Sequence, residues 1–166
     1  MTEYEHIKDT ILHKKFMLEC GLILIDYLYK NNRSEEALEL AKRCARHDNS
    51  KFEGEEIAQF IKLDKSRTSM IDSEINLSED VKRIIAVHWK NNKHHPEHFK
   101  SYKDMTEIDI MEMVCDWYAR SQQFETDFLS FVRIRQEKRF CFDEDFFEKV
   151  YNYCTIIHEN NSKSSQ

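Results

Sequence analysis

The sequence predicts an all-α protein that folds as a single domain. Only two Gly and one Pro occur among the 166 residues, which is too few for a fold built from many tight turns and short strands. Hydrophobic residues make up 40% of the chain, which is enough to fill one core. Long helices are therefore expected over residues 1–160, followed by a disordered polar tail at 161–166.

Three helices are predicted in the first part of the chain. Apolar residues recur near helical spacing over residues 3–30. The stretch NNRSEE breaks this pattern, and Ser34 is expected to cap a second helix that ends at about residue 46. The sequence SKFE at 50–53 has the spacing of a capping box, which predicts a third helix from about Lys51 to about residue 63. A polar surface loop, DKSRTSMIDSEIN, is expected to follow.

Further helices are predicted after this loop, so that the chain holds about six to eight in all. Ser78 is expected to cap the next helix. Pro96 disfavours helical geometry at the residue before it, so NNKHHPEHF is predicted to be a junction between helices. Thr106 starts the most apolar helix, and two amphipathic helices follow at roughly 124–138 and 143–159.

Charge and cysteine content indicate the class of partner and the compartment. A formal net charge of −6 argues against binding to a nucleic-acid backbone, because such proteins need a concentrated basic face, but it still allows a small anionic ligand. The five cysteines show no C-x-x-C spacing, and no signal-peptide pattern opens the chain. The longest apolar runs, such as GLILI, are far shorter than the ~20 residues that cross a bilayer. We therefore expect a reduced, cytoplasmic protein without a membrane partner.

One carboxylate and several histidines are candidates for metal chemistry. Asp116 lies in the apolar run MVCDWYA, where an unpaired charge is costly, so it is expected to meet a cation, a hydrogen-bond network or a metal, or else to turn to solvent. Histidine nitrogens and carboxylate oxygens together suit Mn, Fe, Co, Ni or Zn. Taken alone, each histidine is more often an ordinary core or surface residue. Six of the eight fall on the first predicted helix or at later helix ends: His6, His13, His47, His88, His94 and His95.

The order of these residues resembles that of the HD-domain superfamily of metal-dependent phosphohydrolases, which has one His, an adjacent His-Asp pair, further His residues and a late Asp. The resemblance implies an HD-like helical bundle with one or two divalent transition metals per chain. Asp48 would bridge the two metals. The first metal would be held by His13, His47, Asp48 and Asp116, and the second by His88 with His94 or His95.

A closer resemblance is to an uncharacterised group of HD-like proteins from phages and bacteria. The separation of His13 and His47 is longer than in that group and leaves room for an extra helix, so His6 is an alternative first ligand. If the chain is phage-encoded, its compartment would be the host cytoplasm. The motifs of the group correspond here to LHKK at 12–15, HDNSKF at 47–52, HWKNNKHH at 88–95 and EMVCDW at 112–117.

The resemblance to the HD-domain superfamily implies a phosphohydrolase, and we expect it to act on a nucleotide or another small phosphoester with Asp48 and Lys51 as catalytic residues. A bound metal lowers the pKa of water from about 15.7 to about 7 and so supplies hydroxide near neutral pH. Lys51 stands at a predicted helix start, where its ammonium could hold a phosphate; the alternative is an exposed lysine. Lys93, beside His94, is the other phosphate-binding candidate.

Two other classes of function fit the same sequence. A di-iron oxygenase could use the same ligands and leave an open iron position for oxygen. A non-catalytic module could keep the helical scaffold and bind a nucleotide or a protein partner.

Overall fold

The protein is mainly helical in the part of the chain that the structure describes. The structure, a computed structural model, describes residues 2–52, 58, 61 and 79–163. No strand occurs in these residues, which confirms the all-α prediction. The helices are α1 (Glu3–Lys30), α2 (Ser34–Arg46), α4 (Glu79–Asn91), α5 (Glu107–Gln123), α6 (Phe128–Arg135) and α7 (Glu144–Lys163), with 3₁₀ segments at Asn49–Phe52, Pro96–His98 and Tyr102–Asp104 and a π-helical turn at Gln136–Phe140.

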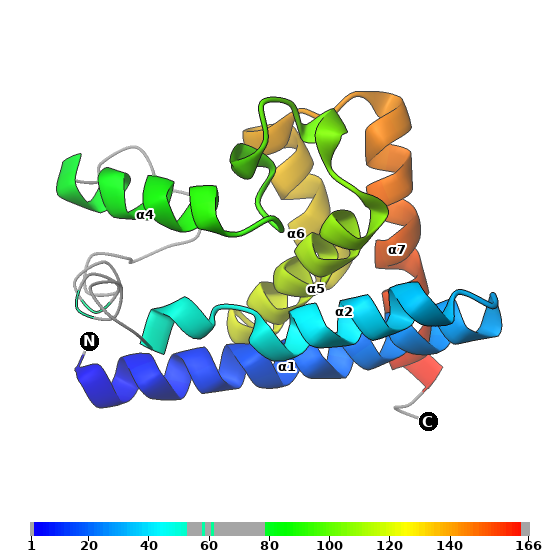
Figure 1. Cartoon of the computed structure of the whole chain (residues 1–166), viewed down its shortest axis with the longest axis horizontal. Coiled ribbons are helices and arrows are strands. Elements are labelled where there is room, and N and C mark those ends of the chain that lie inside the picture. Colours follow the sequence, from blue (N-terminus) through cyan, green and yellow to red (C-terminus); the bar gives the residue numbers. More distant parts are fainter. Residues whose placement is uncertain (1, 53–57, 59–60, 62–78, 164–166) are drawn as a thin grey trace.

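The helices pack around α5, which lies at the centre of the bundle. Figure 1 shows α1 and α2 side by side along the base, with α5 crossing above them and α6 and α7 on its other side. Apolar side chains of α1, α2, α5, α6 and α7 form one core. Helix α4 extends to one side and packs against the segment Pro96–His98. No helix in the described residues is both long enough and apolar enough to span a membrane.

The buried face of helix α1 has a polar half and an apolar half. A capping box starts the helix, in which the Thr2 hydroxyl accepts from the Glu5 backbone N–H and the Glu5 carboxylate accepts from that of Thr2. The predicted helix is confirmed, but of the apolar residues that indicated it Ile11, Leu12 and Leu22 are exposed. The buried positions recur at helical spacing and are polar in the first half (His6, Thr10 and His13) and mainly apolar in the second (Met17, Cys20, Gly21, Leu24 and Leu28). One helix therefore supplies both the apolar core and a polar centre.

The predicted cap of α2 is wrong, because the helix already includes Ser34 and its N-cap is Arg33, which makes no side-chain cap hydrogen bond. The Arg33 guanidinium instead pairs with Glu36 in the first turn and with Glu107 at the start of α5. A tertiary ion pair therefore fixes this helix start, where the sequence suggested a local cap.

The C-terminal helices differ from the prediction at their ends. The helix predicted to start at about residue 124 begins at Phe128, because Glu125 adopts a left-handed conformation (φ 52°) and the Asp127 carboxylate caps the new helix by accepting from the Ser130 N–H at 2.8 Å. The predicted disordered tail is wrong for residues 161–163, which continue α7. Residues 164–166 lie outside the described residues.

The predicted third helix begins with a 3₁₀ turn at Asn49–Phe52. Of the rest of its predicted range, the structure describes residues 58 and 61, and both are helical. The other residues of that range, the Glu53 half of its capping box, the polar loop and the Ser78 cap lie outside the described residues.

Helices α1 and α2 approach closely at Gly21, and this contact gives a first prediction. A Cβ at position 21 would lie 2.8 Å from the buried Cys44 Sγ, so overpacking should cost about 1–3 kcal/mol and outweigh the ~1 kcal/mol gain in helix propensity. Gly21→Ala should lower the free energy of unfolding in urea. In a Cys44→Ala background, where the sulfur is gone, the same change should raise it, and equal effects in both backgrounds would disprove the contact.

Candidate metal centre

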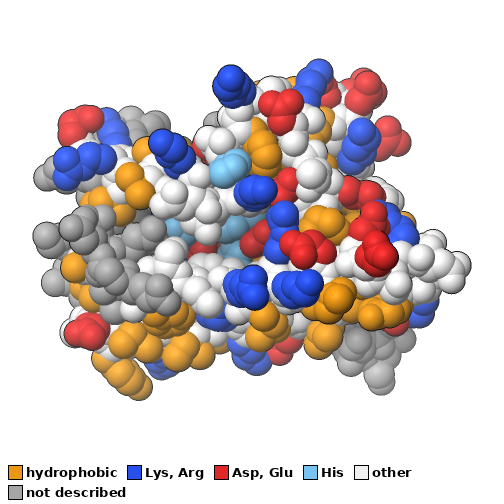
Figure 2. Space-filling view, in the orientation of Figure 1, with side chains coloured by type: hydrophobic (Ala, Val, Ile, Leu, Met, Phe, Trp, Pro, Cys, Tyr) orange, Lys and Arg blue, Asp and Glu red, His pale blue; other side chains and the backbone are white. Residues whose placement is uncertain are grey.

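Seven of the predicted ligands come from elements that converge on one centre. His13 lies on α1, His47 and Asp48 follow α2, and Asp116 lies on α5. His88 lies in the last turn of α4, and His94 and His95 follow that helix in the chain. Figure 2 shows histidine side chains at the floor of a hollow near the centre of one face.

The first group consists of His13, His47 and Asp116, whose ligand atoms lie within 4.8 Å of one another. The His13 Nε2 is 3.1 Å from Asp116 Oδ1 and 3.3 Å from His47 Nε2, and His47 Nε2 is 3.6 Å from Asp116 Oδ1. A tetrahedral metal with ligands at about 2.1 Å separates them by about 3.4 Å. The three side chains therefore already have the spacing of a metal site.

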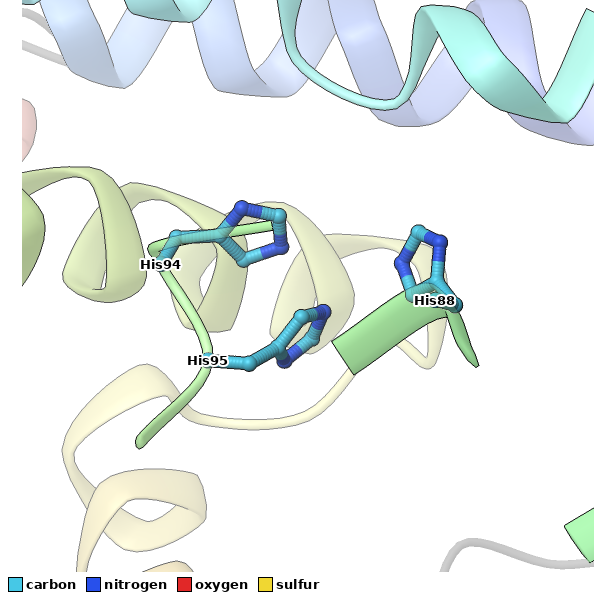
Figure 3. A group of neighbouring side chains, drawn as sticks. All are labelled: His88, His94 and His95. Carbon is cyan, nitrogen blue, oxygen red and sulfur yellow. The ribbon is translucent and has the colours of Figure 1, made fainter. Parts of the chain in front are cut away.

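The second group consists of His88, His94 and His95, drawn in Figure 3, whose ligand atoms also lie within 4.8 Å of one another. The rings of His94 and His95 are 4.0 Å apart between centroids, so the structure brings both of these residues to the group. Within the described part of the chain, the buried His95 Nε2 has no hydrogen-bond partner. A buried nitrogen in that state is what a missing cation would leave behind.

Asp48 lies between the two groups. Its Oδ2 is 3.5 Å from His47 Nε2 and 4.0 Å from His13 Nε2, whereas its Oδ1 is 3.4 Å from His88 Nε2 and also lacks a hydrogen-bond partner among the described residues. The backbone of Asp48 is left-handed in this position (φ 55°). Asp tolerates that conformation better than most residues do. Each carboxylate oxygen thus faces one group.

Hydrogen bonds from α5 orient the imidazole rings. His13 Nδ1 lies 2.9 Å from Gln123 Oε1. Glu112 Oε1 lies 3.1 Å from His47 Nδ1 and 3.3 Å from His94 Nδ1, so one carboxylate serves one histidine of each group. If each Nδ1 donates its proton to these oxygens, each Nε2 keeps its lone pair for a metal.

The charge state of the centre also favours a cation. Burial disfavours the charged form of Asp48, but His47, Lys51 and other nearby cations outweigh it and hold the pKa of Asp48 well below its usual value. Burial likewise opposes ionisation of Asp116, yet His13 and His47 lower its pKa. Both carboxylates are therefore ionised although Asp48 is buried and Asp116 only partly exposed, and such a pair is stable only with positive charge beside it.

The two histidines of the first group differ in their titration. Burial, with a smaller effect of Arg120, lowers the pKa of His13 to about 4, so this imidazole is neutral and ready to donate a lone pair. Burial also disfavours the charged form of His47, but Asp48, Asp116 and Glu112 reverse the effect and raise its pKa to about 10. Without a metal, a proton on His47 supplies part of the positive charge that the carboxylates need.

Three other candidates from the sequence lie around the centre in different ways. His6, the alternative first ligand, is not in the first group; its Nε2 lies 3.3 Å from the Lys51 carbonyl oxygen and ties the 3₁₀ turn to α1. The buried Lys51 ammonium donates to Asp48 Oδ2. Lys93 is exposed. The phosphate-binding roles of Lys51 and Lys93 stay predictions.

Sequence reasoning missed the residues that support the ligands. Glu112 precedes Asp116 by four residues and so shares its helix face, which is a signal that could have indicated it. Lys14 donates to the His47 carbonyl oxygen at 2.6 Å and to Asn49 Oδ1 at 2.7 Å, which holds the turn that carries Asp48. Lys14 and Gln123 have no distinguishing local pattern, because their partners are far away in the chain.

The shared role of Glu112 gives a second prediction. Glu112→Gln keeps the shape but offers only one acceptor oxygen and no charge, so the affinity for metal should fall about 10–100-fold in both groups. Gln123→Leu should weaken only the group that contains His13. Titration of metal-free protein with Zn²⁺ in a calorimeter measures both effects. Wild-type affinity in Glu112→Gln would show that this carboxylate does not support the ligands.

Comparison with known proteins adds a family but no activity. Neither the curated proteins nor the solved structures contain a match to this chain. The model of a family of unknown function, DUF5662, matches residues 2–156, which include both groups of the candidate metal centre. The chain therefore belongs to the family of unknown function DUF5662.

Proposed function

We propose that the protein is a metal-dependent phosphohydrolase with two divalent transition metals per chain. The observation that carries this proposal is the pair of buried ligand groups joined by Asp48, whose two oxygens face different groups. In two-metal hydrolases the ions lie about 3.5–4 Å apart, a separation that a single carboxylate can bridge. The resemblance to the HD-domain superfamily is consistent with this arrangement.

The ligand types limit the choice of metal. Imidazole nitrogens and carboxylate oxygens suit Mn, Fe, Co, Ni and Zn. None of the metal-ligand groups found in the described residues includes a cysteine, which disfavours a thiolate site for Cu(I). One metal would be held by His13, His47, Asp48 and Asp116 and the other by Asp48, His88, His94 and His95.

Bound metals would supply hydroxide near neutral pH and offset charge on the phosphoryl oxygens. The side chains of this chain would fix both ions in place, because Asp48 would offer one oxygen to each group and Glu112 orients a histidine of each group. Lys51 would have a second task. Once metal neutralises Asp48, the Lys51 ammonium that now pairs with it would be available to hold a phosphate of a nucleotide or another small phosphoester.

Phosphate release from a panel of nucleotides and small phosphoesters tests the proposal. The protein is purified without chelator and loaded in turn with Mn²⁺, Fe²⁺, Co²⁺, Ni²⁺ and Zn²⁺. Asp116→Asn should abolish the release, because it removes a charged ligand of the first group. Asp145→Asn, at an exposed aspartate on α7, is the matched control and should leave it unchanged. No release by any metal-loaded form, or equal release by Asp116→Asn, would refute the proposal.

A di-iron oxygenase is the second candidate, and the placement of the two lysines favours it. Lys51 is paired with Asp48 and Lys93 is exposed. If Lys51 keeps this partner when metal binds, the arrangement suits a substrate without phosphate. Iron in the purified protein, an absorption band of oxidised iron and oxygen uptake on adding substrate would support this candidate. Tight nucleotide binding without metal or turnover would instead support a non-catalytic module.

A further inference from the structure

The outer face of α1 carries an exposed apolar stripe along its whole length. The members are Tyr4, Ile11, Leu18, Leu22 and Tyr29, with exposed fractions of 73%, 56%, 44%, 66% and 57%. Figure 2 shows hydrophobic side chains along the lower edge of the molecule, where Figure 1 places α1. Single exposed apolar residues are ordinary, but a continuous row on one helix marks a contact surface.

The spacing of the stripe is that of a helix–helix seam. The five stripe residues are separated by seven, seven, four and seven positions. Three further residues lie between them, Lys8, Lys15 and the partly buried Ile25. Together the eight positions alternate in steps of four and three, which is the spacing of a coiled-coil seam. A 28-residue helix is about 42 Å long, so the seam extends over four heptads. The stripe lies on the face of α1 opposite to His13, and a partner there would leave the metal centre open.

Charges beside the seam indicate the orientation of the partner helix. One flank of α1 carries Lys8, Lys15, Glu19 and Asp26. The two lysines lie in the N-terminal half of the helix and the two acids in the C-terminal half. Helices that pack antiparallel bring the same flank of each helix together, with opposite halves facing. A second copy of α1 in that orientation would place each lysine beside an acid.

We propose that the outer face of α1 binds a second copy of this chain as an antiparallel two-helix seam. In the register that sets Tyr4 opposite the partner's Tyr29 and Ile11 opposite the partner's Leu22, Lys8 stands opposite the partner's Ile25 and Lys15 opposite the partner's Leu18. Each lysine then lies beside an acid that follows its opposite residue by one position, the partner's Asp26 for Lys8 and the partner's Glu19 for Lys15. Glu5 and the partner's Lys30 complete the flank. A parallel pair would instead place the two copies of Lys8, and of Lys15, together within the seam.

The apolar stripe and the charges have different tasks in this dimer. Exposed ion pairs contribute little affinity, and within one chain Lys15 already lies 3.5 Å from Glu19. The stripe therefore supplies the affinity, while the charges exclude the parallel orientation.

Sedimentation velocity of the full chain over a wide range of concentrations tests the proposal. The wild type should sediment with twice the mass of one chain. Leu22→Glu should give monomer, whereas Leu38→Glu, at a 54% exposed leucine on α2, should leave the dimer intact. A monomeric wild type, or a dimer that survives Leu22→Glu, would overturn the proposal. Far-UV circular dichroism verifies that each variant keeps its helices.

A charge swap tests the orientation separately. Lys8→Glu with Lys15→Glu should weaken the dimer at least tenfold, because acid then faces acid. Adding Glu19→Lys and Asp26→Lys to the same chain should restore the affinity of the dimer. In an antiparallel dimer the new glutamates of one chain then face the new lysines of the other. Failure of the fourfold variant to recover would overturn the antiparallel seam.

Discussion

Asp48→Ala is expected to lose both metals. The two oxygens of this carboxylate face different ligand groups, with Oδ2 toward His47 and Oδ1 toward His88. Without the Asp48 carboxylate, most of the remaining ligands in each group are neutral imidazoles. Elemental analysis of protein purified without chelator should find about two metals per wild-type chain, the number expected for a bridged site, and none in the variant.

Asp48→Asn is the matched control for the backbone. Asn tolerates the left-handed conformation of position 48 as well as Asp does, so this variant removes the charge without straining the turn. Loss of metal in both variants would assign the effect to the carboxylate. Full metal content in Asp48→Asn would show that the charge is not needed, and the bridging role would be wrong.

Metal loading is expected to raise the stability of the fold by several kcal/mol. A ligand that binds only the folded state contributes about 4 kcal/mol per site at a free concentration 1,000 times its Kd. Two sites therefore contribute up to about 8 kcal/mol, and even one site should shift Tm by ~8 °C or more for a chain of this size. The physical reason is that Asp48 and Asp116 are ionised and buried, so a cation in the folded state offsets their repulsion.

Thermal unfolding with and without chelator measures this effect. The Tm of the wild type should fall when metal is removed and recover when Zn²⁺ or Mn²⁺ is added. The Tm of Asp48→Asn should be insensitive to both treatments. If chelator leaves the wild-type Tm unchanged, the two groups hold no metal.

The fold could be predicted from the sequence because periodicity is a local property. The buried positions of α1 repeat at helical spacing, and the scarcity of Gly and Pro excluded turn-rich architectures. The ends of helices were less predictable. Ser34 has the chemistry of a cap, but the Arg33 ion pair with Glu107, a residue far along the chain, fixed that helix start instead.

The sequence could predict which residue types would form the candidate centre, but not every residue that contributes to it. His6 and His13 occupy the same buried face of α1, and periodicity cannot distinguish them. The choice follows from how α1 sits against α5, which places His13, and not His6, beside Asp116. Glu112 was missed for the same reason, since its importance comes from the approach of His47 and His94 to one carboxylate.

Because the two groups share Asp48 and Glu112, the binding of one metal ion should affect the binding of the other. A chain with one ion would leave one Asp48 oxygen buried and facing no cation, while Glu112 would already hold the rings of both groups in place. An ion in one group would fix Asp48 in the position from which its other oxygen faces the second group. Half-filled chains should be scarce, and filling should follow a steep, sigmoidal curve in which most chains are either empty or complete.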